Sequence, residues 1–314
     1  YVFTIADVEN NIISGYTNES GKWQKNKFPY PDIVYNRLPT FRQEKLKRAK
    51  QFFNMLSNRQ IPYFNDSFFD KWDSYQLLRQ STQLQPFLLE TVRVNDEEKA
   101  KFFLQKHGIV YAKPITGSTG EGIFVLTLLP NGSILMRTHQ RTYTLHKAEF
   151  ETLLTNLKGK SKPYLLQKGI TLQNQRGKSF DFRILMQKPD NVWQMTGIGV
   201  RQAKKNGITT HVPKGGTILS LTDLPVAVNR NLLNQLGTLA ANAIDEKYRN
   251  IRECSLDIGL DTKGNYWVFE INSKPMSFDE RDIEARRITT LVDTFIRQTN
   301  PKSNTSTLSD QSSY

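Results

Sequence analysis

A glycine-rich segment that follows a lysine is the first candidate for chemistry in this 314-residue sequence. Lys113 and Pro114 precede a run of glycines and hydroxyl side chains over residues 117–122. Glycines let backbone N–H groups approach an anion closely, hydroxyls add donors, and the lysine supplies a fixed positive charge. The candidate phosphate-binding residues are Lys113, Gly117, Ser118, Thr119, Gly120 and Gly122. Because the run matches neither a Walker A loop nor a dinucleotide fingerprint, an ordinary hairpin loop is the alternative.

Three oxygen-bearing side chains farther along the chain form a candidate metal site. Glu270 and Asn272 are two residues apart in a strand pattern, so their side chains project from the same face. Asp257 lies on the preceding strand of the same predicted hairpin and can face them. Oxygen ligands without Cys or His suit a hard cation such as Mg²⁺, which takes phosphate oxygens as further ligands. The alternative is a polar, solvent-facing side of the hairpin.

Two arginines and a histidine are candidates for contact with a transferred group. Asp181 and Arg183 share one face of a predicted strand, and Arg201 lies on the next strand. Arginine suits bidentate contact with phosphate or carboxylate, and the alternative is a structural ion pair with Asp181. His211 lies in a glycine-rich segment, although a lone histidine is more often structural. Together these patterns indicate a phosphate and magnesium site without specifying a reaction.

The elements that carry these residues show both helical and strand periodicity, so we predict a mixed α/β chain. Helices are predicted over 43–58, 70–78, 232–248 and 283–297. Strands are predicted over 31–39, 61–66, 109–114, 122–126, 134–137, 164–167, 180–187, 192–201, 255–260 and 266–272. An apolar segment at residues 1–5 is followed by polar turns. The glycine-rich loop therefore joins two strands, unlike the strand-to-helix loop of a dinucleotide-binding fold.

Composition bounds the class of protein. Hydrophobic residues make up 38% and aromatics 11%, so the chain can bury a core. A transmembrane helix is not expected, because no apolar run reaches about eighteen residues. The first residues also lack the pattern of a secretory signal. Because the chain starts at Tyr1 rather than Met, we expect a fragment or a processed chain.

Net charge and cysteine content restrict the partners. The formal net charge of +13 favours anionic partners such as nucleotide phosphates, acidic substrates or nucleic acid. The sequence shows no basic helix with interleaved aromatics and no zinc-finger or RRM-like motif, which argues against nucleic acid. The single cysteine, Cys254, excludes an intrachain disulfide, fits a reducing compartment and lacks the signals of a nucleophile. With four histidines it cannot form a Cys-rich zinc site.

The order of these motifs resembles an ATP-grasp domain. The motifs are Lys71, Lys113-Pro114 with its glycines, Gln167-Lys168-Gly169-Ile170, Asp181-x-Arg183, Asp257, and Glu270-x-Asn272. Residues 35–37, 179–183, 196–199, 209–216 and 270–275 more closely resemble the YheC/YheD family. That family comprises ATP-grasp proteins of endospore-forming bacteria that are described as associated with the spore coat. The resemblance covers roughly residues 30–290.

The resemblance implies an ATP-grasp fold of the α/β (α+β) class, in which two subdomains clamp ATP. The implied domains are an N-terminal pre-ATP-grasp-like α/β domain over 1–66, a central subdomain over 67–160, a C-terminal subdomain with the magnesium site over 161–297, and a disordered tail over 298–314.

The resemblance also implies a role for each matched residue. Lys71 and Lys113 would contact the ATP phosphates, and the loop over 117–122 would close on them. Gln167, Lys168 and Ile170 would lie in the hinge beside the adenine. Arg183 and Arg201 would stabilise the γ-phosphate or an acyl-phosphate, with His211 nearby. Asp257, Glu270 and Asn272 would hold one or two Mg²⁺ or Mn²⁺ ions. Residues 173–175 lack the acidic side chain that often binds ribose in this fold.

These implied roles predict an ATP-dependent carboxylate–amine ligase that works through an acyl-phosphate. The carboxylate and the amine acceptor are not identified, and the basic charge suits an acidic peptide or polymer. The alternatives are a spore-coat-associated nucleotide-binding protein without catalysis and phosphoryl transfer without ligation. We expect a cytoplasmic or spore-coat location and no contact with a membrane.

Overall fold

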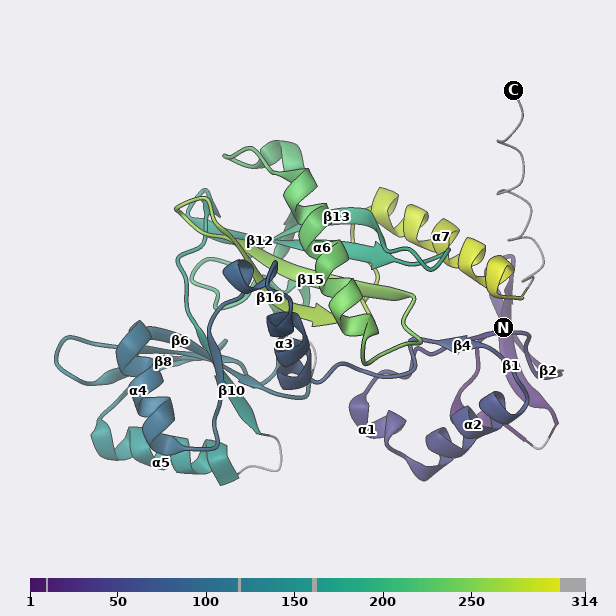
Figure 1. Ribbon diagram of the computed structural model, residues 1–314, viewed down its shortest axis with the longest axis horizontal. Coiled ribbons are helices and arrows are strands. Elements are labelled where there is room, and N and C mark those ends of the chain that lie inside the picture. Colours follow the sequence, from purple (N-terminus) through teal and green to yellow (C-terminus); the bar gives the residue numbers. More distant parts are fainter. Residues whose placement is uncertain (10, 118–119, 160–162, 300–314) are drawn as a thin grey trace.

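The computed structural model describes residues 1–9, 11–117, 120–159 and 163–299 of the chain. Within these ranges the chain forms two large antiparallel sheets and a smaller N-terminal unit (Figure 1). In that view the N-terminal unit lies at the right, the first sheet at the lower left, and the second sheet between them. This mixture of helices with antiparallel strands confirms the predicted α+β class. None of the helices in the described part of the chain has the length and apolarity to span a membrane.

The first sheet carries the glycine-rich loop between two of its strands. Its order is β5 (Thr91–Arg93), β10 (Tyr164–Lys168), β6 (Ile109–Pro114), β7 (Phe124–Leu128), β8 (Ile134–Arg137) and β9 (Thr142–Leu145). Helices α4 (Glu97–His107) and α5 (Lys147–Gly159) cover the face where β6 buries Val110 and Ala112. Because side chains alternate along a strand, Tyr111 and Lys113 point away from these helices. The predicted strand–loop–strand arrangement is confirmed, since β6 pairs with β7.

The second sheet separates apolar side chains on one face from charged side chains on the other. Its order is β14 (Thr217–Leu219), β13 (Gln194–Gln202), β12 (Lys178–Gln187), β15 (Glu253–Leu260) and β16 (Tyr266–Asn272), with β11 (Asn174–Gln175) beside β12. On β12, Phe180, Phe182 and Ile184 are fully buried in the core formed with α6 (Arg230–Asp245). The intervening Asp181 and Arg183 therefore project from the opposite face. Helix α3 (Lys71–Gln80) packs beside α6 and β16, and α7 (Arg281–Thr299) packs on β13.

The N-terminal unit differs from the sequence prediction in two places. Its elements are β1 (Ile13–Glu19), β2 (Lys22–Phe28), β3 (Val34–Tyr35), α1 (Phe41–Glu44), α2 (Lys47–Asn58) and β4 (Tyr63–Phe64). The polar segment predicted as turns forms the hairpin β1–β2, because Ser20 and Gly21 both adopt the positive φ of a tight hairpin turn, 51° and 85°. The helix predicted over 43–58 is two helices, since Leu46 has extended backbone with φ −62° and ψ 139°.

A buried carboxylate ties the N-terminal unit to the second sheet. Glu253 of β15 is 0% exposed and accepts hydrogen bonds from Tyr35 Oη at 2.5 Å and from Arg287 Nε at 2.8 Å. Burial, followed by Glu253, raises the pKa of Tyr35, so this phenol stays protonated. Burial acts to lower the pKa of Arg287, but Glu253 raises it further, so Arg287 stays charged. Asn65 adds to the junction by donating to the backbone oxygens of Glu253 and Ser273 at 2.9 and 2.5 Å.

Strand β10 and helix α7 do not fit two of the predicted domain limits. Strand β10 follows the predicted limit between residues 160 and 161, yet it hydrogen-bonds to β5 and β6 of the first sheet. A limit after Lys168 therefore fits the pairing better. In the predicted tail, Gln298 and Thr299 belong to helix α7, and residues 300–314 lie outside the described part of the chain.

We predict that Arg287→Ala lowers the free energy of unfolding by about 3–5 kcal/mol, because it leaves Glu253 as a buried charge without its cation. The matched control is Arg281→Ala at the exposed start of the same helix, which should change this free energy by less than about 0.5 kcal/mol. Urea denaturation followed by circular dichroism measures both. Equal effects of the two substitutions would contradict the assigned role of this ion pair.

Candidate functional site

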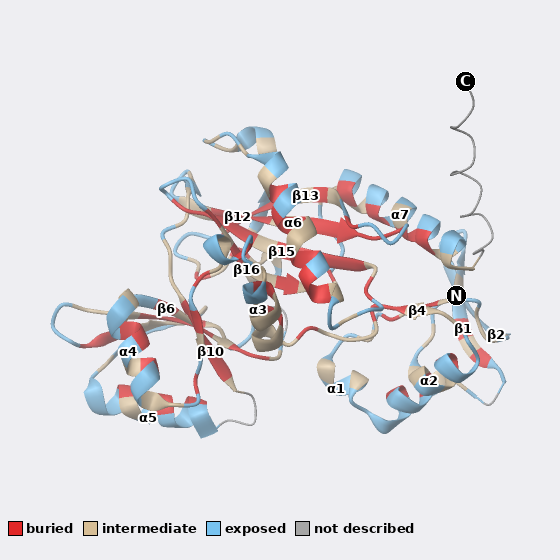
Figure 2. Cartoon of the chain, viewed as in Figure 1, coloured by how far each residue is buried: buried red, intermediate tan, exposed pale blue. Residues whose placement is uncertain are grey.

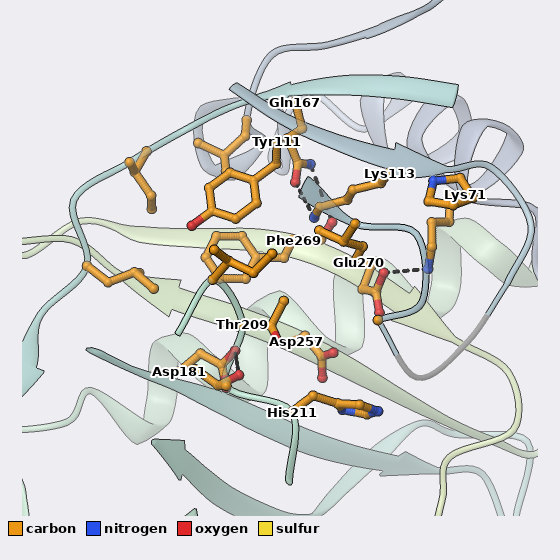
Figure 3. Close-up of a pocket in the computed structure, with 18 of the residues that line it drawn as sticks. Lys71, Tyr111, Lys113, Gln167, Asp181, Thr209, His211, Asp257, Phe269 and Glu270 are labelled. Atoms are coloured by element: carbon orange, nitrogen blue, oxygen red, sulfur yellow. Dashed lines mark hydrogen bonds and ion pairs between the residues drawn. The ribbon is translucent and has the colours of Figure 1, made fainter. Parts of the chain in front are cut away.

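Most of the predicted site residues meet in a cleft between the inner faces of the two sheets (Figure 3). The cleft contains about 1000 Å³ of space, its open mouth included. The predicted residues that line it are Lys71, Lys113, Gly117, Gly120, Gln167, Lys168, Ile170, Arg201, His211, Asp257 and Glu270. The face of the first sheet opposite α4 and α5 and the face of the second sheet opposite α6 thus form the two walls.

One part of the cleft is apolar, and its residues were not singled out from the sequence. Leu89, Tyr111, Leu172 and Phe269 line the cleft together with the predicted Ile170. Phe269 reaches it through a β-bulge, because Asp257 pairs with Glu270 while Ile258 pairs with Val268. The bulge leaves Phe269 without a register partner and lets it line the cleft beside its neighbour Glu270. Such a wall suits the flat face of an aromatic ring system.

Charged side chains line the cleft beside this apolar wall. Lys71 Nζ lies 2.5 Å from Glu270 Oε2, and Lys113 Nζ donates to Gln167 Oε1 at 2.7 Å. Lys71 begins helix α3, whose N-terminus is capped by the Asp70 side chain. Burial acts to raise the pKa of Glu270, but Lys71 and Lys113 outweigh it and hold that pKa well below its usual range. Glu270 is therefore an anion at neutral pH.

Arg201 of β13 contacts two aspartates of the second sheet, Asp181 on β12 and Asp257 on β15. Its Nε donates to Asp181 Oδ1 at 3.1 Å, and its Nη2 lies 3.0 Å from Asp257 Oδ1. The second approach is an ion pair without hydrogen-bond geometry, because Asp257 Oδ1 has no hydrogen-bond partner within the described ranges. Thr210 Oγ1 also donates to Asp181, at 2.5 Å. Asp181 thus orients Arg201, which supports the alternative in which Asp181 forms a structural ion pair.

The oxygen donors at the charged part of the cleft determine which metal ion they can hold. Within the described residues no group of three or more His, Cys, Asp or Glu side chains is arranged to hold a metal. The predicted set has two carboxylates, Asp257 and Glu270, which pair directly across β15 and β16. Asn272 does not line the cleft and instead donates to Glu270 Oε1 at 3.1 Å. Two carboxylates fit Mg²⁺ when phosphate oxygens and water complete its shell.

Arg183 lies in a second hollow that adjoins the cleft rather than in the cleft itself. This hollow holds about 510 Å³, its mouth included, and shares Arg201 and His211 with the cleft. Its wall continues along residues 276–280. Within the described part of the chain, Arg183 Nε, His211 Nε2 and Glu280 Oε1 are buried without hydrogen-bond partners. Burial, followed by the charge of Arg201, lowers the pKa of His211, so this imidazole is neutral at pH 7.

The glycine-rich loop divides into an anchored end and a part that lines the cleft. Gly122 does not line the cleft; its carbonyl accepts a hydrogen bond from Tyr164 Oη at 3.2 Å. Its φ is +75°, and a Cβ there would lie 2.9 Å from Tyr164 Oη, so the position requires glycine. Gly117 and Gly120 line the cleft. The predicted Ser118 and Thr119 lie outside the described residues.

The N-terminal unit contacts the segment that follows strand β16. Arg37 Nη1 donates to the carbonyl of Pro275 at 2.7 Å, and the Lys274 ammonium pairs with Glu44. Asn36 Nδ2 also donates to Glu44, at 3.2 Å. We call these contacts the clamp. They place Arg37 of the Tyr35-Asn36-Arg37 motif beside the end of β16, which the sequence did not indicate because the partner of Arg37 lies more than two hundred residues away.

The structure also gives the positions of residues 173–175 and of Cys254. Residues 173–175 do not line the cleft, so they provide no ribose contact there. Cys254 is fully buried, and burial raises the pKa of its thiol, which leaves it unreactive as predicted.

The cleft lies between two antiparallel α+β units, is lined in part by a glycine-rich hairpin loop, and carries paired cations and carboxylates. These features define an ATP-grasp protein. Residues 60–298 match the family described as YheC/D like ATP-grasp, and the chain belongs to this family. The resemblance seen in the sequence is thereby confirmed.

Two curated relatives come from Bacillus subtilis (strain 168). Endospore coat-associated protein YheD is 31% identical over 281 residues, which cover 85% of this chain and 62% of that protein. Endospore coat-associated protein YheC is 27% identical over 291 residues, which cover 87% of this chain and 79% of that protein. The chain thus spans less than two thirds of the length of YheD.

Solved structures share the fold at low sequence identity. The ATP-grasp ligase PsnB, complexed with a minimal precursor, gives a TM-score of 0.54 at 15% identity over 93% of this chain and 90% of that chain. D-alanyl-alanine synthetase A from Vibrio cholerae O1 biovar eltor gives 0.56 at 10% identity over 92% and 82%. The D-alanine-D-alanine ligase from Coxiella burnetii gives 0.54 at 15% identity over 92% and 75%. These likenesses confirm the ATP-grasp fold.

We predict that Gly122→Ala weakens nucleotide binding at least about tenfold, because the new methyl group pushes Tyr164 away from the anchored end of the loop. Gly132→Ala is the matched control in the next hairpin turn, where φ is +79° and nothing lies within 4 Å of the added Cβ. Both substitutions carry the same backbone strain, about 1–2 kcal/mol. Titration with a fluorescent ATP analogue compares them, and equal affinities would refute the anchoring role.

Proposed function

We propose that this chain binds ATP with Mg²⁺ in the cleft and uses it to join a carboxylate to an amine. The observation that supports this most is the charge arrangement at one end of the cleft. There Lys71, Lys113 and Arg201 lie among Asp181, Asp257 and Glu270, beside an apolar wall. The apolar wall suits a nucleobase, and the charged end suits the phosphates and their metal.

In this proposal the adenine lies against Phe269, Tyr111 and Ile170, and the backbone near Lys168 reads its edge. Lys113 and the loop residues Gly117 and Gly120 contact the phosphates. Lys71, which is paired with Glu270, exchanges this carboxylate for phosphate oxygens when nucleotide binds. A short lysine–carboxylate pair thus keeps both groups in place until their ligands arrive.

Asp257 and Glu270 would hold Mg²⁺, or Mn²⁺ in its place, and Asn272 would orient Glu270 through its hydrogen bond. The ion supplies neutralisation of the phosphate charge that builds up during transfer. Glu270 suits this role because its depressed pKa keeps it ionised without a metal.

The adjoining hollow would receive the carboxylate and the amine. A carboxylate oxygen held by Arg183 attacks the γ-phosphorus, the bond to the β-phosphate oxygen breaks, and ADP leaves. The amine nitrogen then attacks the acyl carbon and phosphate leaves. Neutral His211 can accept the proton that the amine loses, since its Nε2 has no partner within the described residues. Glu280 can hold the incoming amine before it loses that proton, for its Oε1 is equally unpaired in the described chain.

The substrate class follows from charge, and a second function follows from the relatives. With a net charge of +13, the chain suits an acidic peptide or polymer as its substrate. Both curated relatives are named coat-associated proteins, which favours a nucleotide-binding role in a spore coat as the second candidate. Release of ADP in the presence of a carboxylate distinguishes the enzyme from this second function.

We predict that Glu270→Gln and Lys113→Ala each weaken Mg²⁺-dependent ATP binding by at least about tenfold, since each removes a charge that faces the metal or the phosphates. The control is Lys99→Ala, an exposed lysine on α4. Isothermal titration calorimetry with and without Mg²⁺ measures the affinities. Absence of ATP binding by the wild type, or equal affinities for all variants, would refute the nucleotide site.

We predict that Arg183→Met abolishes carboxylate-dependent ADP release and leaves ATP affinity within about twofold, because Arg183 lines the hollow and not the cleft. A panel of carboxylic acids and acidic peptides is incubated with ATP, Mg²⁺ and hydroxylamine, which converts an acyl-phosphate to a hydroxamate. Arg141→Met, at an exposed position, is the control. If ATP binds but no carboxylate releases ADP, the ligase proposal fails and the coat role remains.

A further inference from the structure

Helix α7 carries a row of aliphatic side chains that the described part of the chain leaves uncovered. Ile288, Val292 and Ile296 are 53%, 47% and 54% exposed and follow one another at four-residue spacing. Residues four apart lie on one face of a helix, and the exposed Ala285 extends the same row. Single exposed aliphatic residues are ordinary on a protein surface, whereas a continuous row on one helix face marks a contact surface.

The row faces away from the rest of the molecule. Helix α7 packs on β13 with its opposite side, where Ile283, Arg287, Leu291 and Thr294 are buried. From the 3.6 residues of a helical turn, the row is centred roughly 150° around the axis from this buried side. Figure 2 shows exposed residues along the outer side of α7. Another helix can therefore lie on the row without displacing β13.

Four exposed charged residues run along one side of the row. When a second copy of the helix is laid in the reverse direction, each of them faces a residue of opposite charge. They are Asp282, Arg286, Asp293 and Arg297. Their spacings of four, seven and four residues are the same in both directions. Their signs, negative, positive, negative and positive, become opposite when the order is reversed. A second α7 laid antiparallel on the first would thus place Arg286 opposite Asp293 and Asp282 opposite Arg297.

The present partners of these charges leave them available for such pairing. Arg286 pairs with Asp282 at 3.0 Å, and its Nε donates to the carbonyl of Thr196 at 3.0 Å. Arg297 pairs with Asp190 at 2.7 Å, and the side chains of both ion pairs are exposed. Exposed ion pairs of this kind contribute about 0–1 kcal/mol, so exchanging them costs little. Asp293 forms no ion pair within residues that the structure describes.

We propose that α7 is the contact surface of a homodimer in which two copies pack their α7 helices antiparallel about a two-fold axis. The axis passes at the level of Thr289 and Thr290, the centre of the charge pattern. In this register Val292 of the second copy lies at the level of Arg287, between Ala285 and Ile288, where the small alanine leaves room. Such a contact is isologous, because the same patch serves both copies.

A second copy fits the row better than a lipid surface does. Helices that lie on membranes carry lysines and arginines around their apolar face, whereas two acidic and two basic residues flank this row. The reversed complementarity of the flank is a property that only a twin of this helix is expected to share. Because one helix of 19 residues provides the contact, the interface buries less than about 1,200 Å², which is typical of weak complexes.

Sedimentation velocity of the full chain over a range of roughly 1–300 µM tests the proposal, with a dissociation constant expected on the order of 10 µM. Val292→Glu should shift the equilibrium to monomer, weakening association by at least about tenfold. Phe102→Glu is the matched control, because Phe102 is an exposed aromatic on α4 with 66% exposure. Circular dichroism verifies that each variant is folded.

Charge reversal tests the register. Arg286→Glu should weaken the dimer, because it places two acidic residues opposite each other, and Arg286→Glu combined with Asp293→Arg should restore it. A monomeric wild type at all concentrations overturns the proposal and leaves the row to a different protein. A dimer that survives Val292→Glu also overturns it, since another face would then hold the copies together. Failure of the double reversal to restore association overturns the antiparallel register.

Discussion

The pairing of β15 between β12 and β16 is the constraint on which the site depends. In this register Asp257 lies directly opposite Arg183 on one side and Glu270 on the other. Alternation then directs these charges to one face and the aromatic core of β12 to the other. A slip of one residue would exchange the two faces and bury the charges among apolar side chains. The packing of α6 on the core therefore also secures the positions of the charged residues.

The sequence predicted the parts of the site that depend on local periodicity. Glu270 and Asn272 share a strand and Asp257 lies across one hairpin, so spacing sufficed to bring them together. Lys113 likewise follows from its strand. The apolar wall of the cleft could not be predicted, because Leu89 and Tyr111 come from elements far apart in the chain and Phe269 depends on a bulge. Bulges insert one residue without changing the apolar pattern that periodicity detects.

Long-range contacts account for what else the sequence left open. Arg37 is polar and lies in a loop, so nothing local indicates that it meets Pro275. Arg183 shares its strand face with Asp181, yet Asp181 lines the cleft whereas Arg183 lines the adjoining hollow. Spacing fixes the face of a strand but not how neighbouring loops divide the space above it. The hairpin β1–β2 was not predicted for a different reason: both of its faces are mainly polar, so the sequence lacks an alternating apolar pattern there.

The clamp has a consequence for motion. Two clamp contacts, Arg37 with Pro275 and Glu44 with Lys274, join the N-terminal unit to the end of the second sheet. The contacts of Asn65 and Tyr35 do the same, so these two parts form one body. The first sheet connects to that body through two short links, which leave the second sheet where Leu88 bridges Val268 and where Leu172 bridges Asp261. We therefore expect any opening of the cleft to be a rotation of the first sheet about these two links. In such a rotation Asp257 and Glu270 stay with the second sheet, while Lys113 moves with the first sheet.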